Sequence, residues 1–183
     1  MTTAALLLLS ALAIGAVPLW WDLPVIPRIR LRAGLLLAIG VIALAVAAWL
    51  AVNSAQRDRF DRELAVTLSI LASMAAGGPV TKAVLRLADH GSPQTPTGPA
   101  KSNLLTGGAW IGALERIAVT TTLLAGWPEG LALVLAVKGL GRYPELRSAD
   151  QPGTAERFII GTFSSVLWAC ACAGVGLALR SSG

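Results

Sequence analysis

The stretch AGLLLAIGVIALAVAAWLAV, residues 33–52, decides the expected fold class because it contains no charged residue. A helix rises about 1.5 Å per residue, so about 20 apolar residues match the hydrocarbon core of a bilayer, which is about 30 Å thick. Residues 33–52 are therefore predicted to cross a membrane as a helix.

The composition of the whole chain supports this interpretation. Of its 183 residues, 55% are hydrophobic and 14% are charged, whereas soluble domains carry about 25% charged residues. The net charge of +5 comes from basic residues that stand between hydrophobic blocks rather than along one folded face. Such a distribution is typical of the positive-inside bias of membrane proteins. We therefore expect a lipid bilayer as the environment and no nucleic-acid partner.

Two further blocks decide the number of spans. Residues 4–19 are apolar, and because residues 1–3 contain no Lys or Arg, a retained span is favoured over a cleaved signal peptide. Residues 64–80 are apolar but short, and Gly77-Gly78-Pro79 is expected to interrupt them. This block forms either a third span or an interfacial helix. The expected fold class is all-α, a polytopic integral membrane protein with five or six transmembrane helices.

A stretch rich in Gly, Pro, Ser and Thr, residues 88–107, is predicted to be a loop between two helical halves. The amino-terminal half, residues 1–87, holds two or three spans, followed by one or two amphipathic turns at 81–89. The carboxy-terminal half, residues 108–180, is predicted to contain three helices. Its expected elements are a helix at 108–126, a turn at 127–130, a helix at 131–142, a loop at 143–154 and a last helix at 155–179.

Ionisable residues in the carboxy-terminal half interrupt otherwise apolar helices. Counted from the turn at 127–130, Glu115 lies about 18 Å along one helix and Lys138 about 15 Å along the other, so a hairpin brings both to a similar depth. Unpaired charges at such depth are costly. We therefore predict an interhelical cluster of Glu115, Arg116 and Lys138, with Arg142 nearer the water. The cluster is either a structural clamp or a polar site for an ion, a proton or an anionic headgroup.

The sequence offers little for metal, cofactor or catalytic chemistry. Cys170 and Cys172 are two residues apart, so on a helix they suit neither a mutual disulfide nor one metal ion. His90 is the single histidine, which excludes a His/Cys zinc cluster of the usual kind. The chain has no zinc motif, serine elbow or phosphate-binding glycine loop. We expect no metal and no cofactor, and we assign no catalytic residue.

Small residues at helical spacing predict close helix packing. They are the pair Gly108 and Gly112, and a stripe in the last helix formed by Gly161, Ser165, Ala169 and Cys172. Such residues let helix backbones approach each other, within one chain or in a homo-oligomer. Trp168, in the middle of the last helix, is expected to face another helix.

Positive-inside counting places the loop at 143–154 in the cytoplasm with either five or six spans. It leaves the side of the amino terminus open, because the Pro-containing loop at 22–32 and the charge run at 57–63 exchange sides between the two topologies. The expected location is the cell membrane, which the chain crosses several times.

Four motifs occur in order: GGPVTK at 77–82, IGALER at 111–116, AVKGLGR at 136–142 and ERFIIGT at 156–162. Over residues 77–179 the chain resembles the membrane module of a family of uncharacterised bacterial multi-spanning membrane proteins. The resemblance implies no known activity. It adds Lys82 and Thr162, beside Gly161, to the candidate site residues Glu115, Arg116 and Lys138.

Three functional hypotheses remain open from the sequence. The first is an accessory subunit or scaffold that acts through helix–helix packing with a membrane-protein partner. The second is a small oligomeric transporter or channel that uses the Glu115–Lys138 region as its polar site. The third is a membrane-embedded enzyme on lipid-linked substrates, with Glu115 as acid or base and the neighbouring cations holding an anion. Without a catalytic motif, an enzyme is the least favoured of the three.

Overall fold

The computed structural model describes residues 9–11, 29–53, 59–88, 106–147 and 153–181. Within these ranges the chain is helical apart from short turns, and no strand occurs, so the expected all-α fold is confirmed for this part of the chain. The long helices are α2 (Ile29–Val52), α3 (Arg59–Ala88), α4 (Thr106–Leu124), α5 (Glu129–Arg147) and α6 (Thr154–Ser181). Residues 9–11 add one helical turn.

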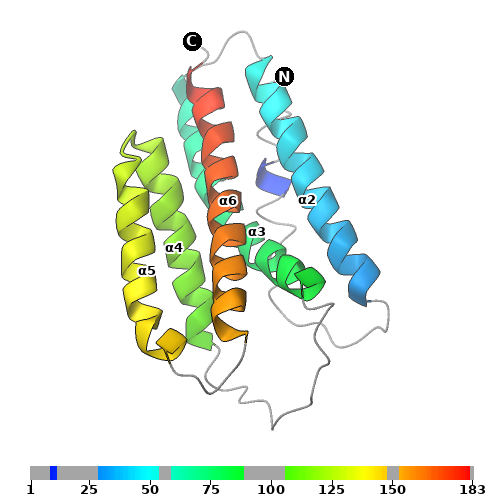
Figure 1. Cartoon of the computed structure of the whole chain (residues 1–183). Helices are drawn as coiled ribbons and strands as arrows, with labels where there is room; N and C mark the ends of the chain where they lie inside the picture. The colour runs from blue at the N-terminus through cyan, green and yellow to red at the C-terminus, as the bar shows by residue number, and fades with distance from the viewer. Residues whose placement is uncertain (1–8, 12–28, 54–58, 89–105, 148–152, 182–183) are drawn as a thin grey trace.

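The helices form a bundle in which α3 and α6 are central (Figure 1). Both α2 and α4 pack against α3 and α6, and α5 packs on α4. Because α4 and α5 are joined by a short turn, they run antiparallel as the hairpin expected from the sequence. The expected division of the chain into residues 1–87, 88–107 and 108–180 stays a prediction, because residues 89–105 lie outside the described part.

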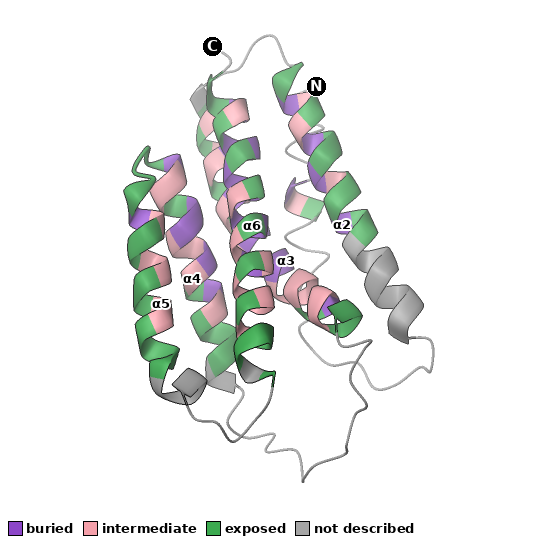
Figure 2. Cartoon of the chain, in the orientation of Figure 1, coloured by how far each residue is buried: buried purple, intermediate pink, exposed green. Residues whose placement is uncertain are grey.

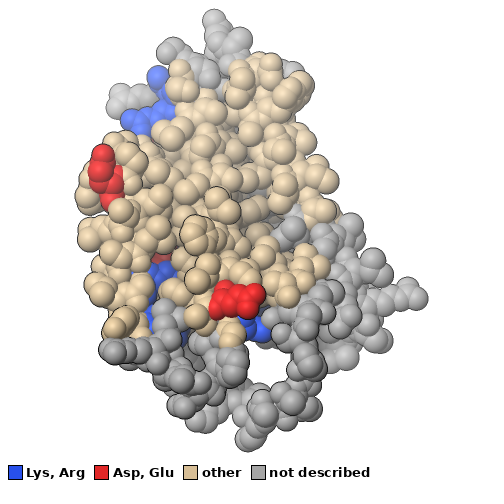
Figure 3. Space-filling view, viewed as in Figure 1, with Lys and Arg blue, Asp and Glu red and all other residues tan. Residues whose placement is uncertain are grey.

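Large apolar side chains cover much of the outside of the bundle. Figure 2 shows buried residues on the inward sides of α2, α4 and α6, and exposed residues on their outward sides. The exposed positions include Ile42 and Trp49 of α2, Trp110 and Leu114 of α4, Val137 and Leu140 of α5, and Phe163 and Leu167 of α6. On the face shown in Figure 3, charged atoms are few and lie in small separate groups.

Two described helical stretches are long and apolar enough to cross a membrane: Phe60–Ala88 and Ala155–Ser181. In an apolar stretch of 18 residues within each helix, only 39% and 33% respectively is buried within the bundle. Much of this apolar surface therefore faces outward. The expected helix at 33–52 lies within α2, where Ala38–Val52 is a shorter apolar stretch. The expected first span at 4–19 lies outside the described residues except for 9–11.

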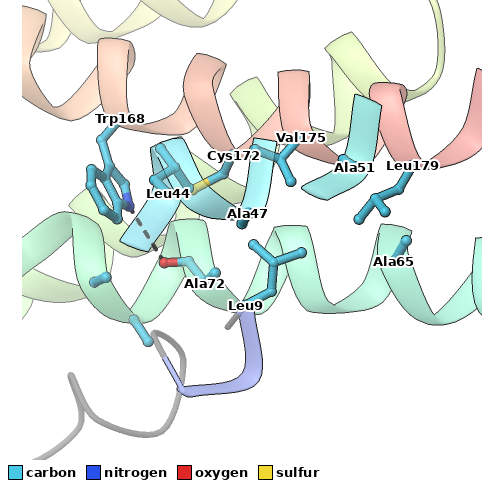
Figure 4. Packing of buried hydrophobic residues seen from close by; sticks show 12 residues of the cluster. Leu9, Leu44, Ala47, Ala51, Ala65, Ala72, Trp168, Cys172, Val175 and Leu179 are labelled. Carbon is cyan, nitrogen blue, oxygen red and sulfur yellow. Dashed lines mark hydrogen bonds between the residues drawn. The ribbon is translucent and has the colours of Figure 1, made fainter. Parts of the chain in front are cut away.

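The centre of the bundle combines many alanines with a few leucines, a valine, a cysteine and one tryptophan. The buried cluster contains Leu44, Ala47, Ala51, Ala65, Ala72, Ala75, Ala76, Trp168, Cys172, Val175 and Leu179, with Leu9 from the amino-terminal turn. The indole Nε1 of Trp168 donates a hydrogen bond of 3.5 Å to the Ala72 carbonyl of α3 (Figure 4). The prediction that Trp168 faces another helix is confirmed.

The stripe expected on the last helix faces the interior. Ser165, Ala169 and Cys172 are buried, and Gly161 approaches Leu85 and Thr81 of α3. Gly176, which the sequence analysis did not single out, lies closer still: a Cβ there would be 2.7 Å from the Ser69 hydroxyl. Such residues allow the close contact between α3 and α6.

The pair Gly108 and Gly112 behaves differently from the stripe. Gly108 is exposed, with no atom within 4 Å of the place where a Cβ would lie, and Gly112 has only Arg116 of its own helix nearby. This pair therefore does not mediate a helix contact among the described residues.

The interruption expected at Gly77-Gly78-Pro79 is wrong, because α3 continues through Pro79 to Ala88. Proline lacks one backbone donor and clashes with the preceding turn, so a helix that continues through it bends. Figure 1 shows the carboxy-terminal part of α3 running at an angle to its start. The turns expected at 81–89 belong to this long helix as far as Ala88, and neighbouring helices supply the packing that supports it.

Two other expected boundaries also differ from the structure. Helix α2 begins at Ile29, so the end of the loop expected at 22–32 is helical. Helix α5 continues to Arg147, which shortens the loop expected at 143–154. The residues added at the start of α2 include Arg30 and Arg32, and arginine is a good helix former, whereas α5 continues through Pro144 against the local propensity.

The close contact at Gly176 predicts a specific packing defect. In Gly176→Val the new side chain would meet Ser69 and Leu124 of the neighbouring helices, so we expect a loss of about 1–3 kcal/mol in stability. Gly174→Val is the matched control on the same helix, because nothing lies within 4 Å of its Cβ position. Thermal unfolding in detergent measures both, and equal midpoints for the two variants would contradict this account of the α3–α6 contact.

Candidate functional site

The α4–α5 hairpin brings one acidic and one basic side chain together. Lys138 of α5 donates a hydrogen bond to the Glu115 carboxylate of α4 and forms an ion pair with it. Each side chain is 18% exposed, so the ion pair is largely buried. The contact between Glu115 and Lys138, predicted from residue counts along the hairpin, is therefore present.

The turn that joins the two helices fixes their relative position. The Gly126 N–H donates to the Leu123 carbonyl at 3.1 Å, and the Trp127 N–H donates to the Thr122 carbonyl at 2.9 Å. With Gly126 at a φ of 75°, these bonds form the Schellman motif that commonly ends a helix. At Gly130 a Cβ would lie 2.6 Å from Thr122, so the start of α5 packs tightly on the end of α4.

Arg116 points away from the ion pair and into the bundle. It follows Glu115 on α4, and successive residues of a helix are turned by about 100°. Its Nη1 donates to the Ser165 hydroxyl of α6 at 3.4 Å, and its Nη2 donates to the Met74 carbonyl of α3 at 3.1 Å. Only 4% of the residue is exposed. The predicted cluster of Glu115, Arg116 and Lys138 therefore consists of an ion pair and a neighbouring arginine. This arginine links α3, α4 and α6.

Gly77 provides the space for Arg116. A Cβ at this position would lie 2.3 Å from the arginine Cδ and 2.6 Å from its Nε, which is closer than any real Cβ contact. The glycine therefore allows the aliphatic part of Arg116 to cross α3 on its way to the Met74 carbonyl. The sequence analysis used Gly77 only as a helix breaker and did not find this role.

A row of hydroxyl side chains continues from Arg116 along the α3–α4 contact. Thr120 of α4 donates a hydrogen bond of 2.8 Å to Ser73 of α3, and both residues are fully buried. Ser69 is also buried, one turn further along α3. The sequence analysis missed this row, although the spacing of four between Ser69, Ser73 and Gly77 is a signal that these residues share one helix face.

A small cleft lies between α4, α5 and α6. Glu115, Arg116, Lys138 and Ser165 line it, together with apolar side chains from the same three helices. The space inside it that the centre of a water-sized sphere can occupy is about 10 Å³. A cavity needs about 10–15 Å³ of such space to hold one water molecule. The cleft therefore has room for about one water molecule, but not for a small-molecule ligand.

The structure does not bring the other candidates into this cleft. Arg142 is exposed on α5, one turn beyond Lys138 and nearer the end of the helix, and Lys82 is exposed on α3. Thr162 is half-buried, and its hydroxyl oxygen has no hydrogen-bond partner among the described residues. None of the three lines the cleft.

The two cysteines lie on α6, and no metal site is found among the described residues. Cys170 and Cys172 are free thiols, and Cys172 packs in the buried cluster of the bundle. In residues 9–11, 29–53, 59–88, 106–147 and 153–181, no three His, Cys, Asp or Glu side chains are grouped as metal ligands.

Comparison of the chain with protein-family models, with curated proteins and with solved structures gives no match. The family resemblance of residues 77–179 therefore stays a prediction. What the site does has to be inferred from its own geometry and charge.

The space that Gly77 leaves for Arg116 can be tested by a double-mutant cycle. We expect Gly77→Ala to lower stability by about 1–3 kcal/mol, because the added methyl overlaps the arginine. In an Arg116→Ala background the same change should cost at least about 1 kcal/mol less. Gly139→Ala is the control, since nothing lies within 4 Å of that Cβ position. Additive losses in thermal unfolding would show that the two residues do not interact.

The ion pair of the hairpin can be tested by charge exchange. Glu115→Lys or Lys138→Glu alone places two like charges together, and we expect each to lower stability by about 1–3 kcal/mol, between the values for exposed and buried pairs. The double exchange restores an opposite-charge pair and should recover most of the loss. Folded yield and unfolding midpoint are the measurements. A double variant no better than either single variant would exclude the pairing.

Proposed function

We propose that the chain is a multi-pass protein of the cell membrane that acts as an accessory subunit or scaffold through helix–helix packing. The observation that carries this proposal is the distribution of side chains: small and polar residues, with some leucines, valines and one tryptophan, fill the described interior, and many large apolar residues face outward. Soluble monomers rarely expose contiguous apolar patches larger than a few hundred Å². Lipid is the environment in which such an outer surface is stable.

The spacing of charges along α3 and α6 supports a membrane-spanning arrangement. Residues 64–81 of α3 and 158–179 of α6 contain no charged residue, which corresponds to helix lengths of about 27 and 33 Å. The two helices pack side by side and run in opposite directions. Their charge-free parts therefore match a hydrocarbon core of about 30 Å, with Glu63 and Arg180 near one boundary and Lys82 and Arg157 near the other.

The way the interior is filled supports a packing role. In the described part of the bundle, Arg116 joins α4 to α3 and α6, and Ser73 joins α3 to α4. These contacts occupy the space that a transport pathway through a single chain would need. The outward apolar faces of α2, α4 and α5 remain available to lipid or to another membrane protein. In this proposal the loop after α5 lies in the cytoplasm, as positive-inside counting indicates.

One observation favours a second candidate, a small oligomeric transporter or channel. The cleft at Glu115 and Lys138 is partly open to the outside, and ionisable residues inside a membrane commonly mark ion pathways. In this alternative, several copies would surround the pathway, with the cleft of each copy contributing to its lining.

The mass of the native particle distinguishes the two candidates. The experiment is purification from native membranes in a mild detergent, followed by mass determination of the intact particle. A foreign subunit in fixed stoichiometry is the expected result, and it supports the accessory role. A homo-oligomer without a foreign subunit would contradict that role and favour transport, which an ion flux lost in Glu115→Gln would then support.

Membrane insertion is tested by a charge placed on the outward face of α6. Leu167 is 65% exposed and lies in the middle of the charge-free stretch. In lipid, Leu167→Lys should cost about 2.5–3.5 kcal/mol and reduce the fraction that resists alkaline carbonate extraction. Ala155→Lys, at the exposed start of α6, should have no effect. On a water-exposed surface both changes would alter stability by less than about 0.5 kcal/mol, and equal extraction of both variants would contradict insertion.

A further inference from the structure

The two ends of the bundle differ in charge. The starts of α2, α4 and α6 and the ends of α3 and α5 form one end, the lower one in Figure 1, which we call the basic end. The charged residues within 22–32, 82–105 and 142–157, which belong to these helix ends and the segments attached to them, are nine basic and five acidic. Their net charge is +4. For the opposite end, residues 57–63, Glu129 and Arg180 contribute four basic and four acidic residues, so the net charge is 0.

The excess of positive charge at the basic end does not depend on which ion pairs form there. All five acidic residues are already counted, so pairing within this end leaves a net charge of +4. Among the side chains that the structure describes, Lys82 and Arg86 of α3, Arg142 of α5 and Arg157 of α6 are exposed, as is Glu156. The positive charge is therefore spread over three helices.

The basic residues lie where the charge-free parts of the helices stop. The charge-free stretch of α3, residues 64–81, ends directly before Lys82, and that of α6, residues 158–179, begins directly after Arg157. In the proposed membrane location these positions are at the boundary of the hydrocarbon core. Lys82 and Arg86 are four residues apart, so they share one face of α3. The exposed cations therefore lie at the level of the lipid headgroups.

We propose that the basic end binds anionic phospholipid headgroups of the leaflet that it faces. The inference rests on the proposed membrane location of the chain. Clusters of Lys and Arg directly beside transmembrane helices attract anionic lipids. Positive-inside counting places the loop after α5, which belongs to this end, in the cytoplasm, and the cytoplasmic leaflet is the one with a negative surface. The charge of the basic end and that of the leaflet are therefore complementary.

Exposed apolar side chains beside the basic residues favour a phospholipid over a soluble anion. On α5, Leu140 is 73% exposed and stands two residues before Arg142. On α6, Ile159 is 53% exposed and stands two residues after Arg157. Tyr143 is also exposed, and tyrosine is enriched at the membrane–water interface. A phospholipid is able to place its acyl chains against the apolar side chains while its phosphate meets the cations.

Two double variants of α3 separate headgroup binding from a general effect of net charge. Lys82→Gln with Arg86→Gln removes two positive charges from the basic end. Arg59→Gln with Arg62→Gln removes two from the opposite end of the same helix. Each double variant lowers the net charge of the chain by two, from the +5 of the native sequence. Only the variant of the basic end should weaken the binding of an anionic lipid.

The measurement is thermal stabilisation of the full chain in mild detergent, titrated with phosphatidylglycerol or phosphatidylcholine. We expect the anionic phosphatidylglycerol to stabilise the protein more, and added salt to reduce the difference because exposed charges are screened. The apparent affinity for phosphatidylglycerol should fall about tenfold or more in the variant of the basic end and stay within about twofold in the control.

Equal stabilisation by the two lipids would overturn this inference, as would equal losses in the two double variants or no loss in the variant of the basic end. Arg142→Gln with Arg157→Gln removes two charges from the same end on α5 and α6, and it replaces the α3 variant should that one not fold. Carbonate extraction separates this failure from that of the proposed function. Protein that stays in the membrane without preferring the anionic lipid contradicts the headgroup site alone, whereas protein released from the membrane contradicts the membrane location.

Discussion

The burial of the Arg116 guanidinium is the constraint on which the interior of the bundle depends. A charged group is tolerated away from water only where hydrogen-bond acceptors replace the water. Here one acceptor is a hydroxyl of α6 and another is a backbone carbonyl of α3, while Gly77 gives the side chain its passage. The three helices α3, α4 and α6 therefore meet at one level, and the positions of the cleft and of the ion pair follow from that meeting.

The remaining interior contacts are of the kind that holds helices together in lipid. Because lipid tails are as apolar as leucine, helices in a bilayer associate through close van der Waals contact and interhelical hydrogen bonds. The approach of Gly176 to Ser69 is a contact of the first kind, and the bond between Thr120 and Ser73 is one of the second. The proposed membrane location thus accounts for the small interior residues and for the large outward ones together.

The sequence predicts the hairpin and its ion pair because their geometry depends only on residue counts from a turn. The direction of Arg116 could not be predicted in this way. Which side of α4 faces the bundle is decided by its packing on α3 and α6, and no local pattern of α4 encodes that choice. The helix through Pro79 was missed for a related reason. The local propensity of Gly77-Gly78-Pro79 is unfavourable for a helix, and tertiary packing overrides it. Likewise, the spacing of Ser69, Ser73 and Gly77 gains meaning only once a partner helix is known.

The turn at Gly126 and Trp127 has a consequence for the rotational phase of α5. The Schellman motif and the tight contact at Gly130 fix the position of α5 relative to α4. One residue more or fewer in this connection would rotate α5 by about 100° and shift it by about 1.5 Å along its axis. Lys138 would then leave the cleft, and an apolar neighbour would replace it. The length of a four-residue connection, at 125–128, therefore determines whether charge or hydrocarbon faces Glu115.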